Sequence, residues 1–209
     1  MEKIKVGVLG ATGMVGQQYI SLLAKHPWFE VSYLAASPNS AGKTYLNAVS
    51  GRWQMAVEIP EKIAELIVED ANIADLAVSR CVFVFSALDM DKQQTRELEN
   101  AYAALGIPVV SNASAHRGTD DVPMLIPEIN HEHINIIASQ RNKRGWQKGF
   151  IAVKPNCSLQ SYMTPTFALL QAGYQIRKMI ITTMQAVSGA GYPGVPSLDM
   201  IDNIVPFIA

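Results

Sequence analysis

The chain has 209 residues, of which 17 are Lys or Arg and 18 are Asp or Glu, so its formal net charge is −1. A chain of this length can bury one full hydrophobic core and part of a second domain. The balanced charge, without a basic run, argues against a surface for polyanions. We therefore do not expect a nucleic-acid partner.

The beginning of the chain predicts a protein without a membrane anchor. Residues 1–5 (M-E-K-I-K) lead into an apolar strand and lack the long apolar region of a signal peptide. No segment has the uninterrupted apolar length that a membrane span needs. The two cysteines, Cys81 and Cys157, suggest free thiols in a reducing compartment, so we expect a cytoplasmic protein.

The first 36 residues contain a strand, a glycine-rich turn, a helix and a second strand. Residues 5–9 (K-V-G-V-L) form an apolar run, followed by G-A-T-G-M-V-G at 10–16. We expect a helix at 15–25, ended by His26-Pro27, and a strand at 30–36. In this context a glycine motif predicts dinucleotide binding.

The three glycines of this turn have different expected tasks. Gly10 would permit the tight turn, Gly13 would let the backbone approach a pyrophosphate, and Gly16 would let helix and strand pack closely. The N–H groups at the start of the helix would receive the phosphates. The cofactor-binding residues predicted here are Gly10, Thr12, Gly13, Met14, Val15 and Gly16.

The end of the second strand indicates which dinucleotide binds. An NAD enzyme commonly has Asp or Glu there to hold the ribose 2′-hydroxyl. Residues 35–43 (A-A-S-P-N-S-A-G-K) contain no carboxylate, and Ser37, Ser40 and Lys43 could surround a 2′-phosphate instead. The sequence therefore favours NADP.

The pattern of strands and helices then continues. We expect strands at 66–68, 81–85 and 107–110, and an amphipathic helix at 91–105 that is closed by Gly106. This alternation predicts an α/β fold with a Rossmann-like, doubly wound parallel sheet. We place this nucleotide-binding domain at residues 1–130.

Residues 131–209 are expected to begin an α+β catalytic and dimerisation domain. Its expected elements are a strand at 149–153, a helix at 158–171, a β-rich segment at 176–187 and a helix at 196–204. We expect this second domain to be incomplete.

Cys157 lies where the turn P-N-C-S (155–158) meets the predicted helix. Unpaired N–H groups and the helix dipole favour the thiolate there, and the thiolate is the reactive form. A lone cysteine of this kind would more often be structural, but the dinucleotide motif in the same chain favours a nucleophile. Cys81, inside an apolar strand, is expected to be inert packing.

Five segments in order resemble the aspartate-β-semialdehyde dehydrogenase family. They are residues 10–16, 37–43, 111–117 (S-N-A-S-A-H-R), 154–158 (K-P-N-C-S) and 185–191 (Q-A-V-S-G-A-G). The S-A-G-K and S-G-A-G segments are most similar to the archaeal and fungal branch. The resemblance covers essentially the whole chain.

The resemblance implies NADPH-dependent reduction of aspartyl β-phosphate through a Cys157 thioester. Asn156 would help set the oxyanion environment, Arg117 would clamp the phosphate with its guanidinium fork, and Gln185 would orient the substrate. The further residues that it implies for phosphate or cofactor binding are Asn112, Ser114, Ser86, Ala87, Ser188 and Gly189. A homo-oligomer, either dimer or tetramer, is also implied.

Two departures from the family matter. Asn39 stands where this branch usually has arginine, which removes a cation from the proposed 2′-phosphate site. The family's catalytic histidine and carboxylate-binding arginine lie downstream of position 209, so we expect an impaired fragment. The alternatives are an enzyme like N-acetyl-glutamyl-phosphate reductase, and an NADP-binding fragment without catalysis.

Other polar residues are expected to have no catalytic task. His116 is expected to be structural, and Asp120 and Asp121 to be solvated. His131-Glu132-His133 resembles a metal pair, but no cysteine or third histidine stands nearby, so we expect no metal.

Overall fold

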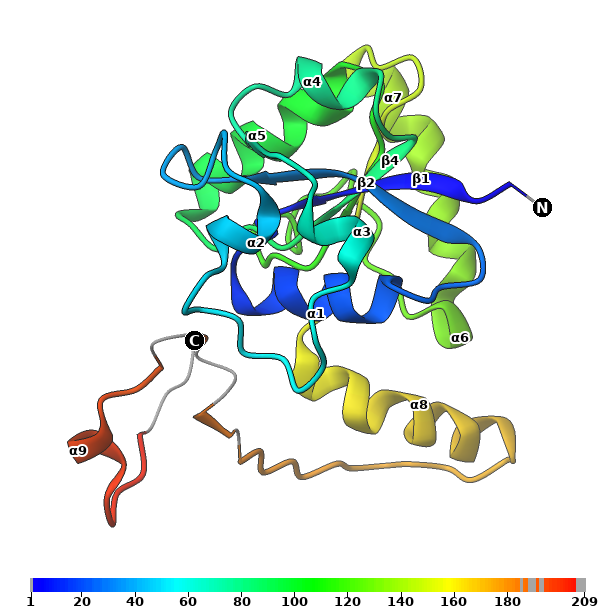
Figure 1. Ribbon diagram of the computed structural model, residues 1–209. Helices are drawn as coiled ribbons and strands as arrows, with labels where there is room; N and C mark the ends of the chain where they lie inside the picture. The colour runs from blue at the N-terminus through cyan, green and yellow to red at the C-terminus, as the bar shows by residue number, and fades with distance from the viewer. Residues whose placement is uncertain (1, 185, 188–190, 192–193, 206–209) are drawn as a thin grey trace. The chain divides into compact units, whose positions relative to one another are not determined.

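The computed structural model describes residues 2–184, 186–187, 191 and 194–205 (Figure 1). The chain divides into two compact units, residues 1–176 and residues 177–209. In the described part of the second unit, the regular element is the short helix α9 (Ser197–Met200).

The first unit is built on a parallel six-stranded sheet with the order β3-β2-β1-β4-β5-β6. The strands are β1 (Ile4–Leu9), β2 (Phe29–Ala36), β3 (Val68–Asp70), β4 (Phe83–Ser86), β5 (Val109–Ser111) and β6 (Ile151–Val153). The order reverses at β1, because β2 and β3 lie on one side of it and β4 to β6 on the other. This is the doubly wound arrangement that the sequence predicts.

Helices cover both faces of the sheet (Figure 1). The helices of this unit are α1 (Met14–Leu23), α2 (Tyr45–Ala48), α3 (Glu61–Ala64), α4 (Asp75–Val78), α5 (Lys92–Ala104), α6 (Pro127–Asn130), the 3-10 helix η1 (His131–Ile136), α7 (Ile137–Arg144) and α8 (Cys157–Gln171). Helix α8 has no buried residue and belongs to neither core. One core joins the sheet to α1, α2 and α3, and a second core joins it to α4 and α5. The central strands are buried on both faces, which explains their continuous apolar runs.

The long helix α5 begins and ends where the sequence predicts. The carboxylate of Asp91 caps it by accepting hydrogen bonds from the N–H groups of Gln93 and Gln94. Gly106 follows its last turn with φ at +88°, a conformation that glycine adopts without strain.

The segment after residue 150 both confirms and corrects the prediction. The strand expected at 149–153 is β6, which pairs in parallel with β5 and so extends the sheet of the first domain. The β-rich segment expected at 176–187 is wrong for its described residues, 176–184 and 186–187, none of which is in a strand. A strand forms only where a neighbouring strand supplies ladder hydrogen bonds, whatever the composition. The helix expected at 196–204 is shortened to α9.

Candidate active site

The carboxyl ends of four neighbouring strands form one row. In the register of the sheet, Leu9, Ser86, Ser111 and Val153 lie side by side on β1, β4, β5 and β6. The residues that follow them are Gly10, Ala87, Asn112 and Lys154. In doubly wound sheets ligands bind at this edge, beside the strand where the order reverses. The predicted glycine, phosphate and cysteine segments therefore meet at one edge.

Backbone hydrogen bonds tie this row together. The N–H of Ala87 donates to Leu9 at 2.9 Å, that of Asn112 donates to Ser86 at 2.9 Å, and that of Lys154 donates to Ser111 at 3.1 Å. Each loop is thus fixed to the neighbouring strand. The loops start from a rigid frame, which is what a binding site on loops needs.

The glycine turn has room for a ligand at one of its three glycines. Gly10 has φ at +71°, and a Cβ there would overlap the carbonyl of Ala87. A Cβ at Gly16 would overlap the backbone of Gly10 and Ala11. A Cβ at Gly13 would meet only the carbonyl oxygen of Gly10, at 3.5 Å. Gly10 and Gly16 are therefore required by packing, and Gly13 leaves the space that a pyrophosphate would occupy.

Two buried side chains hold the carbonyl groups of this turn. The hydroxyl of Tyr45 donates to the carbonyl oxygen of Ala11 at 2.9 Å, and the amide of Gln17 donates to that of Thr12 at 3.0 Å. Since the C=O and N–H of a trans peptide point in opposite directions, a fixed carbonyl also fixes the N–H of the next residue. Sequence reasoning did not identify Tyr45 or Gln17 as part of the site.

The segment expected to bind a 2′-phosphate forms a compact turn after β2. The side chains of Ser37 and Lys43 are exposed, whereas Ser40 is buried, with 4% of its surface exposed. The amine of Lys43 donates to the carbonyl oxygen of Asn39 at 2.9 Å. Ser37 and Lys43 can thus reach a ligand from solvent, whereas Ser40 has little exposed surface.

Arg117 spans the loops that follow β5 and β6. Its Nε donates to the carbonyl oxygen of Lys154 at 3.2 Å, and its Nη2 donates to that of Asn112 at 3.3 Å. Ser114 is exposed in the same loop, and its carbonyl oxygen accepts from the N–H of Arg117. Burial and the guanidinium of Arg117 lower the pKa of the Lys154 amine. The two cations create a positive environment at this edge, which suits an anion.

Cys157 is the first residue of α8 and is exposed to solvent. Asn156 caps the helix, because its Oδ1 accepts from the N–H of Ser158 at 2.8 Å. The Sγ atom of Cys157 lies 3.7 Å from the same oxygen. Cys81 is buried as expected, and burial raises the pKa of its thiol to about 12. The accessible thiol is therefore the one at the helix N-terminus.

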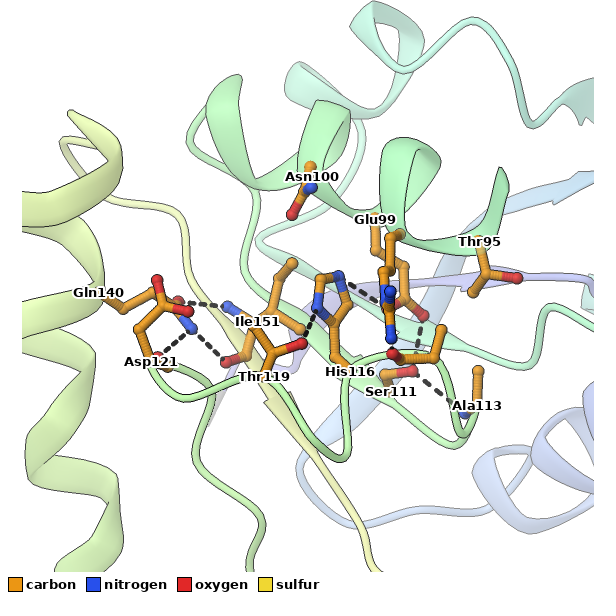
Figure 2. A network of polar contacts seen from close by, with 12 residues as sticks. Thr95, Glu99, Asn100, Ser111, Ala113, His116, Thr119, Asp121, Gln140 and Ile151 are labelled. Carbon is orange, nitrogen blue, oxygen red and sulfur yellow. Dashed lines mark hydrogen bonds and ion pairs between the residues drawn. The ribbon is translucent and has the colours of Figure 1, made fainter. Parts of the chain in front are cut away.

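A network of polar side chains connects α5 with the end of β5 and with the loop that follows it, residues 112–121 (Figure 2). Glu99 of α5 and His116 are both buried, and Glu99 accepts a hydrogen bond from the hydroxyl of Ser111 at 2.6 Å. Burial raises the pKa of Glu99, and the Ser111 hydroxyl partly opposes this. Burial lowers the pKa of His116 to about 4. His116 is thus a buried member of this network, and Glu99 was not identified from the sequence.

Asp121 corrects one expectation. It is buried rather than solvated, because the guanidinium of Arg144 pairs with both of its carboxylate oxygens, at 2.6 and 2.8 Å. This pairing lowers the pKa of Asp121. The partner lies 23 residues away, so the neighbouring sequence gives no sign of it.

Some predicted residues lie outside the described residues, namely Gln185, Ser188 and Gly189. Within the described ranges, no group of three or more His, Cys, Asp or Glu side chains could hold a metal ion. In the same ranges, no helix is long and apolar enough to cross a membrane.

The parallel sheet and its glycine turn define a dinucleotide-binding, Rossmann-like domain. The profile of the family described as "Semialdehyde dehydrogenase, NAD binding domain" matches residues 5–137. The chain therefore belongs to the semialdehyde dehydrogenase family through its NAD-binding domain.

Individual relatives agree with this membership. The aspartate-semialdehyde dehydrogenase of Methanothermobacter thermautotrophicus is 46% identical over 205 residues, which are 98% of this chain and 56% of that protein. The one from Cryptococcus neoformans is 43% identical over 207 residues, which are 99% of this chain and 56% of that protein.

A solved structure agrees as well. The crystal structure of aspartate semialdehyde dehydrogenase with NADP from Candida albicans superposes with a TM-score of 0.84 at 38% identity, and covers 100% of this chain and 56% of that one. The chain thus spans little more than half the length of these relatives. The family resemblance and the fold class predicted from the sequence are confirmed.

Proposed function

We propose that the chain is the cofactor-binding and cysteine-bearing part of an NADP-dependent aspartate-semialdehyde dehydrogenase. This enzyme would reduce aspartyl β-phosphate to aspartate β-semialdehyde, a step in the biosynthesis of lysine, threonine and methionine. The observation that carries the proposal is that the glycine turn, Arg117 and Cys157 follow strands of one sheet and meet at its carboxyl edge. The names and identities of the relatives support it.

The glycine turn fits the diphosphate of a dinucleotide, because Gly13 leaves space beside the start of α1. Ser37 and Lys43 would contact the 2′-phosphate of NADP, while Ser86, Ala87, Ser188 and Gly189 would line the nicotinamide end. When bound, NADPH supplies the hydride that reduces the acyl group.

Cys157 would act as the nucleophile. Its thiolate would attack the acyl carbon of aspartyl β-phosphate, so that a C–S bond forms while the C–O bond to phosphate breaks. Phosphate leaves with the electrons of that bond. Arg117 would bind it through the guanidinium fork, with help from Asn112 and Ser114.

The resulting thioester keeps the acyl group attached to the chain. Asn156, which caps α8 beside Cys157, would stabilise the negative oxygen that develops on the acyl carbon. After reduction the C–S bond breaks, the thiolate leaves with its electrons, and the aldehyde is released. Gln185 would orient the substrate in both steps.

The experiment is phosphate-dependent reduction of NADP by aspartate semialdehyde, measured for this chain and for Cys157→Ala. Activity that the variant loses supports the proposal. Equal activity in both proteins would refute the role of Cys157. NADP binding without turnover would indicate a cofactor-binding fragment that needs the remaining part found in the relatives.

Two further measurements complete this test. N-acetyl-glutamate semialdehyde serves as the competing substrate, and preference for it would favour the related acyl-phosphate reductase.

We also propose that the complete protein is a homo-oligomer, a dimer or a tetramer. Analytical ultracentrifugation of the complete protein tests this, and a monomer at micromolar concentration would refute it.

A further inference from the structure

Glu99 is a fully buried carboxyl group in the network between α5 and the loop that follows β5 (Figure 2). It lies on α5, with none of its surface exposed. Burying a carboxyl group costs free energy unless polar partners compensate for the lost water. A leucine or methionine would fill the same space without this cost. The partners of Glu99 therefore indicate what the carboxyl group does.

The first oxygen of Glu99 begins a chain of hydrogen bonds that ends at Arg117. The hydroxyl of Ser111 donates to Glu99 Oε1 at 2.6 Å, and the N–H of Ala113 donates to Ser111 Oγ at 3.1 Å. The carbonyl of Asn112 belongs to the same peptide group as this N–H. Its oxygen accepts from Arg117 Nη2 at 3.3 Å.

One peptide group thus connects the buried carboxyl group with the guanidinium. In a trans peptide the N–H and the C=O point in opposite directions. Fixing the N–H of Ala113 from below therefore fixes the direction of the Asn112 carbonyl that holds Arg117. Hydrogen bonds in such a chain also polarise one another, which strengthens each of them.

Helix α5 holds the other end of the same loop as well. The second oxygen of Glu99 lies 3.9 Å from Nε2 of His116, the residue before Arg117. His116 Nδ1 is hydrogen-bonded to the hydroxyl of Thr119 at 3.1 Å. Nε of Arg96, also on α5, donates to the carbonyl oxygen of Ala115 at 2.6 Å. The loop is thus anchored to α5 on both sides of the exposed Ser114.

We propose that Glu99 is a positioning residue for Arg117, and that it directs the guanidinium toward the phosphate group of the substrate through Ser111 and the peptide group between Asn112 and Ala113. The inference rests on the proposed function, because that function assigns the phosphate to Arg117. Glu99 does not touch the phosphate itself, since none of its surface is exposed.

The test measures inorganic phosphate binding and the NMR signals of the loop in the 209-residue chain. Ser111→Ala interrupts the hydrogen-bond chain, and Glu99→Gln replaces the carboxyl group by an amide whose oxygen can still accept from Ser111. The control is Glu97→Gln, the same change on the same helix, at an exposed residue whose carboxylate accepts a hydrogen bond from Gln93. Arg117→Ala identifies the phosphate site.

We expect Ser111→Ala to weaken phosphate binding about tenfold, and Glu99→Gln to weaken it about threefold, because a hydrogen bond of the chain is lost in the first variant and weakened in the second. In the 15N-labelled chain, both variants should shift the Ala113 amide signal and the Arg117 Nε signal. Glu97→Gln should change neither. Near-UV circular dichroism checks folding, and if Ser111→Ala does not fold, the nearly isosteric Glu99→Gln still tests the inference.

The outcomes separate the two proposals. Suppose Arg117→Ala abolishes phosphate binding while Ser111→Ala and Glu99→Gln leave the affinity and both NMR signals unchanged. The inference is then wrong, and the proposed function stands. If phosphate affinity does not depend on Arg117, the assignment of the phosphate to Arg117 is wrong, and the inference fails with it.

Discussion

Replacing Tyr45 by Phe should weaken NADP binding although Tyr45 cannot touch the cofactor. Its side chain is fully buried, and its hydroxyl donates to the carbonyl oxygen of Ala11 in the glycine turn at 2.9 Å. The ring packs edge-on against Trp53, with 6.2 Å between the centroids, and this contact survives in Phe. The substitution therefore removes one hydrogen bond and leaves the packing intact.

The expected loss of stability follows from the loss of this hydrogen bond. A buried carbonyl that loses its donor costs about 1–3 kcal/mol, so the free energy of unfolding should fall by roughly 1–2 kcal/mol. In a protein of this size that corresponds to a Tm lower by about 2–8 °C. The peptide group between Ala11 and Thr12 would also no longer be held in the direction that suits a phosphate. We expect NADP to bind about threefold to tenfold more weakly, because binding must then order the turn.

Calorimetric titration with NADP and thermal unfolding measure the two effects. The matched control is Tyr33→Phe, which removes another buried hydroxyl, bonded to the hydroxyl of Tyr102 at 3.0 Å in the core on the opposite face of the sheet. This control should lose stability but keep its NADP affinity. If both variants bind NADP equally well, or both lose affinity to the same extent, the Tyr45 hydroxyl does not hold the turn.

Three further predictions concern the thiols, His116 and the glycine turn. Maleimide should modify the exposed Cys157 faster than Cys81, whose pKa is raised to about 12 by burial, and mass spectrometry showing the reverse would contradict this. Burial lowers the pKa of His116 from 6.5 to about 4, so only the unfolded chain takes up this proton between those values. The free energy of unfolding should thus fall by up to about 3 kcal/mol as the pH drops from 6.5 to about 4. Urea titrations measure this loss, and His116→Gln should abolish it. Gly10→Ala should cost more than about 2 kcal/mol or prevent folding, since its Cβ would overlap the Ala87 carbonyl, whereas Gly13→Ala should unfold at nearly the wild-type temperature but bind NADP poorly. Equal thermal unfolding of the two variants would argue against this division of tasks.

Local patterns predicted the parts of the site that follow directly from strands. The glycine turn comes immediately after β1, and Cys157 begins α8 soon after β6, so an apolar run and the residues after it are enough to find them. The parallel order of the strands follows from the same alternation. These features depend on residues that are neighbours in the sequence, so a single sequence is enough to predict them.

The supporting residues depend on partners far along the chain. Tyr45 contacts Ala11 across 34 positions, and Glu99 contacts Ser111 across 12. The sequence around a tyrosine in a four-residue helix, or around a glutamate in a polar helix, does not indicate a special role. The role becomes visible only when the fold shows the distant residue that it contacts. Asp121 was expected to be solvated for the same reason, because nothing near it in the sequence indicates Arg144.

The short helices were also beyond sequence patterns. Helices α2, α3, α4 and α6 each have four residues, about one turn, which is too short to display a helical period. Between residues 176 and 187 the opposite error occurred, because β-forming composition suggested a strand where the described residues have none.

The row of residues at the carboxyl edge sets the distance between the two ends of the candidate site. Gly10 follows β1 and Lys154 follows β6, three strand spacings away, which is about 14 Å at the usual separation of paired strands. This span is set by the number of intervening strands, and no single substitution can lengthen or shorten it. A redesigned protein that should accept a longer or shorter ligand would therefore have to change the loops above the row, while the sheet keeps the two ends of the site at a constant distance.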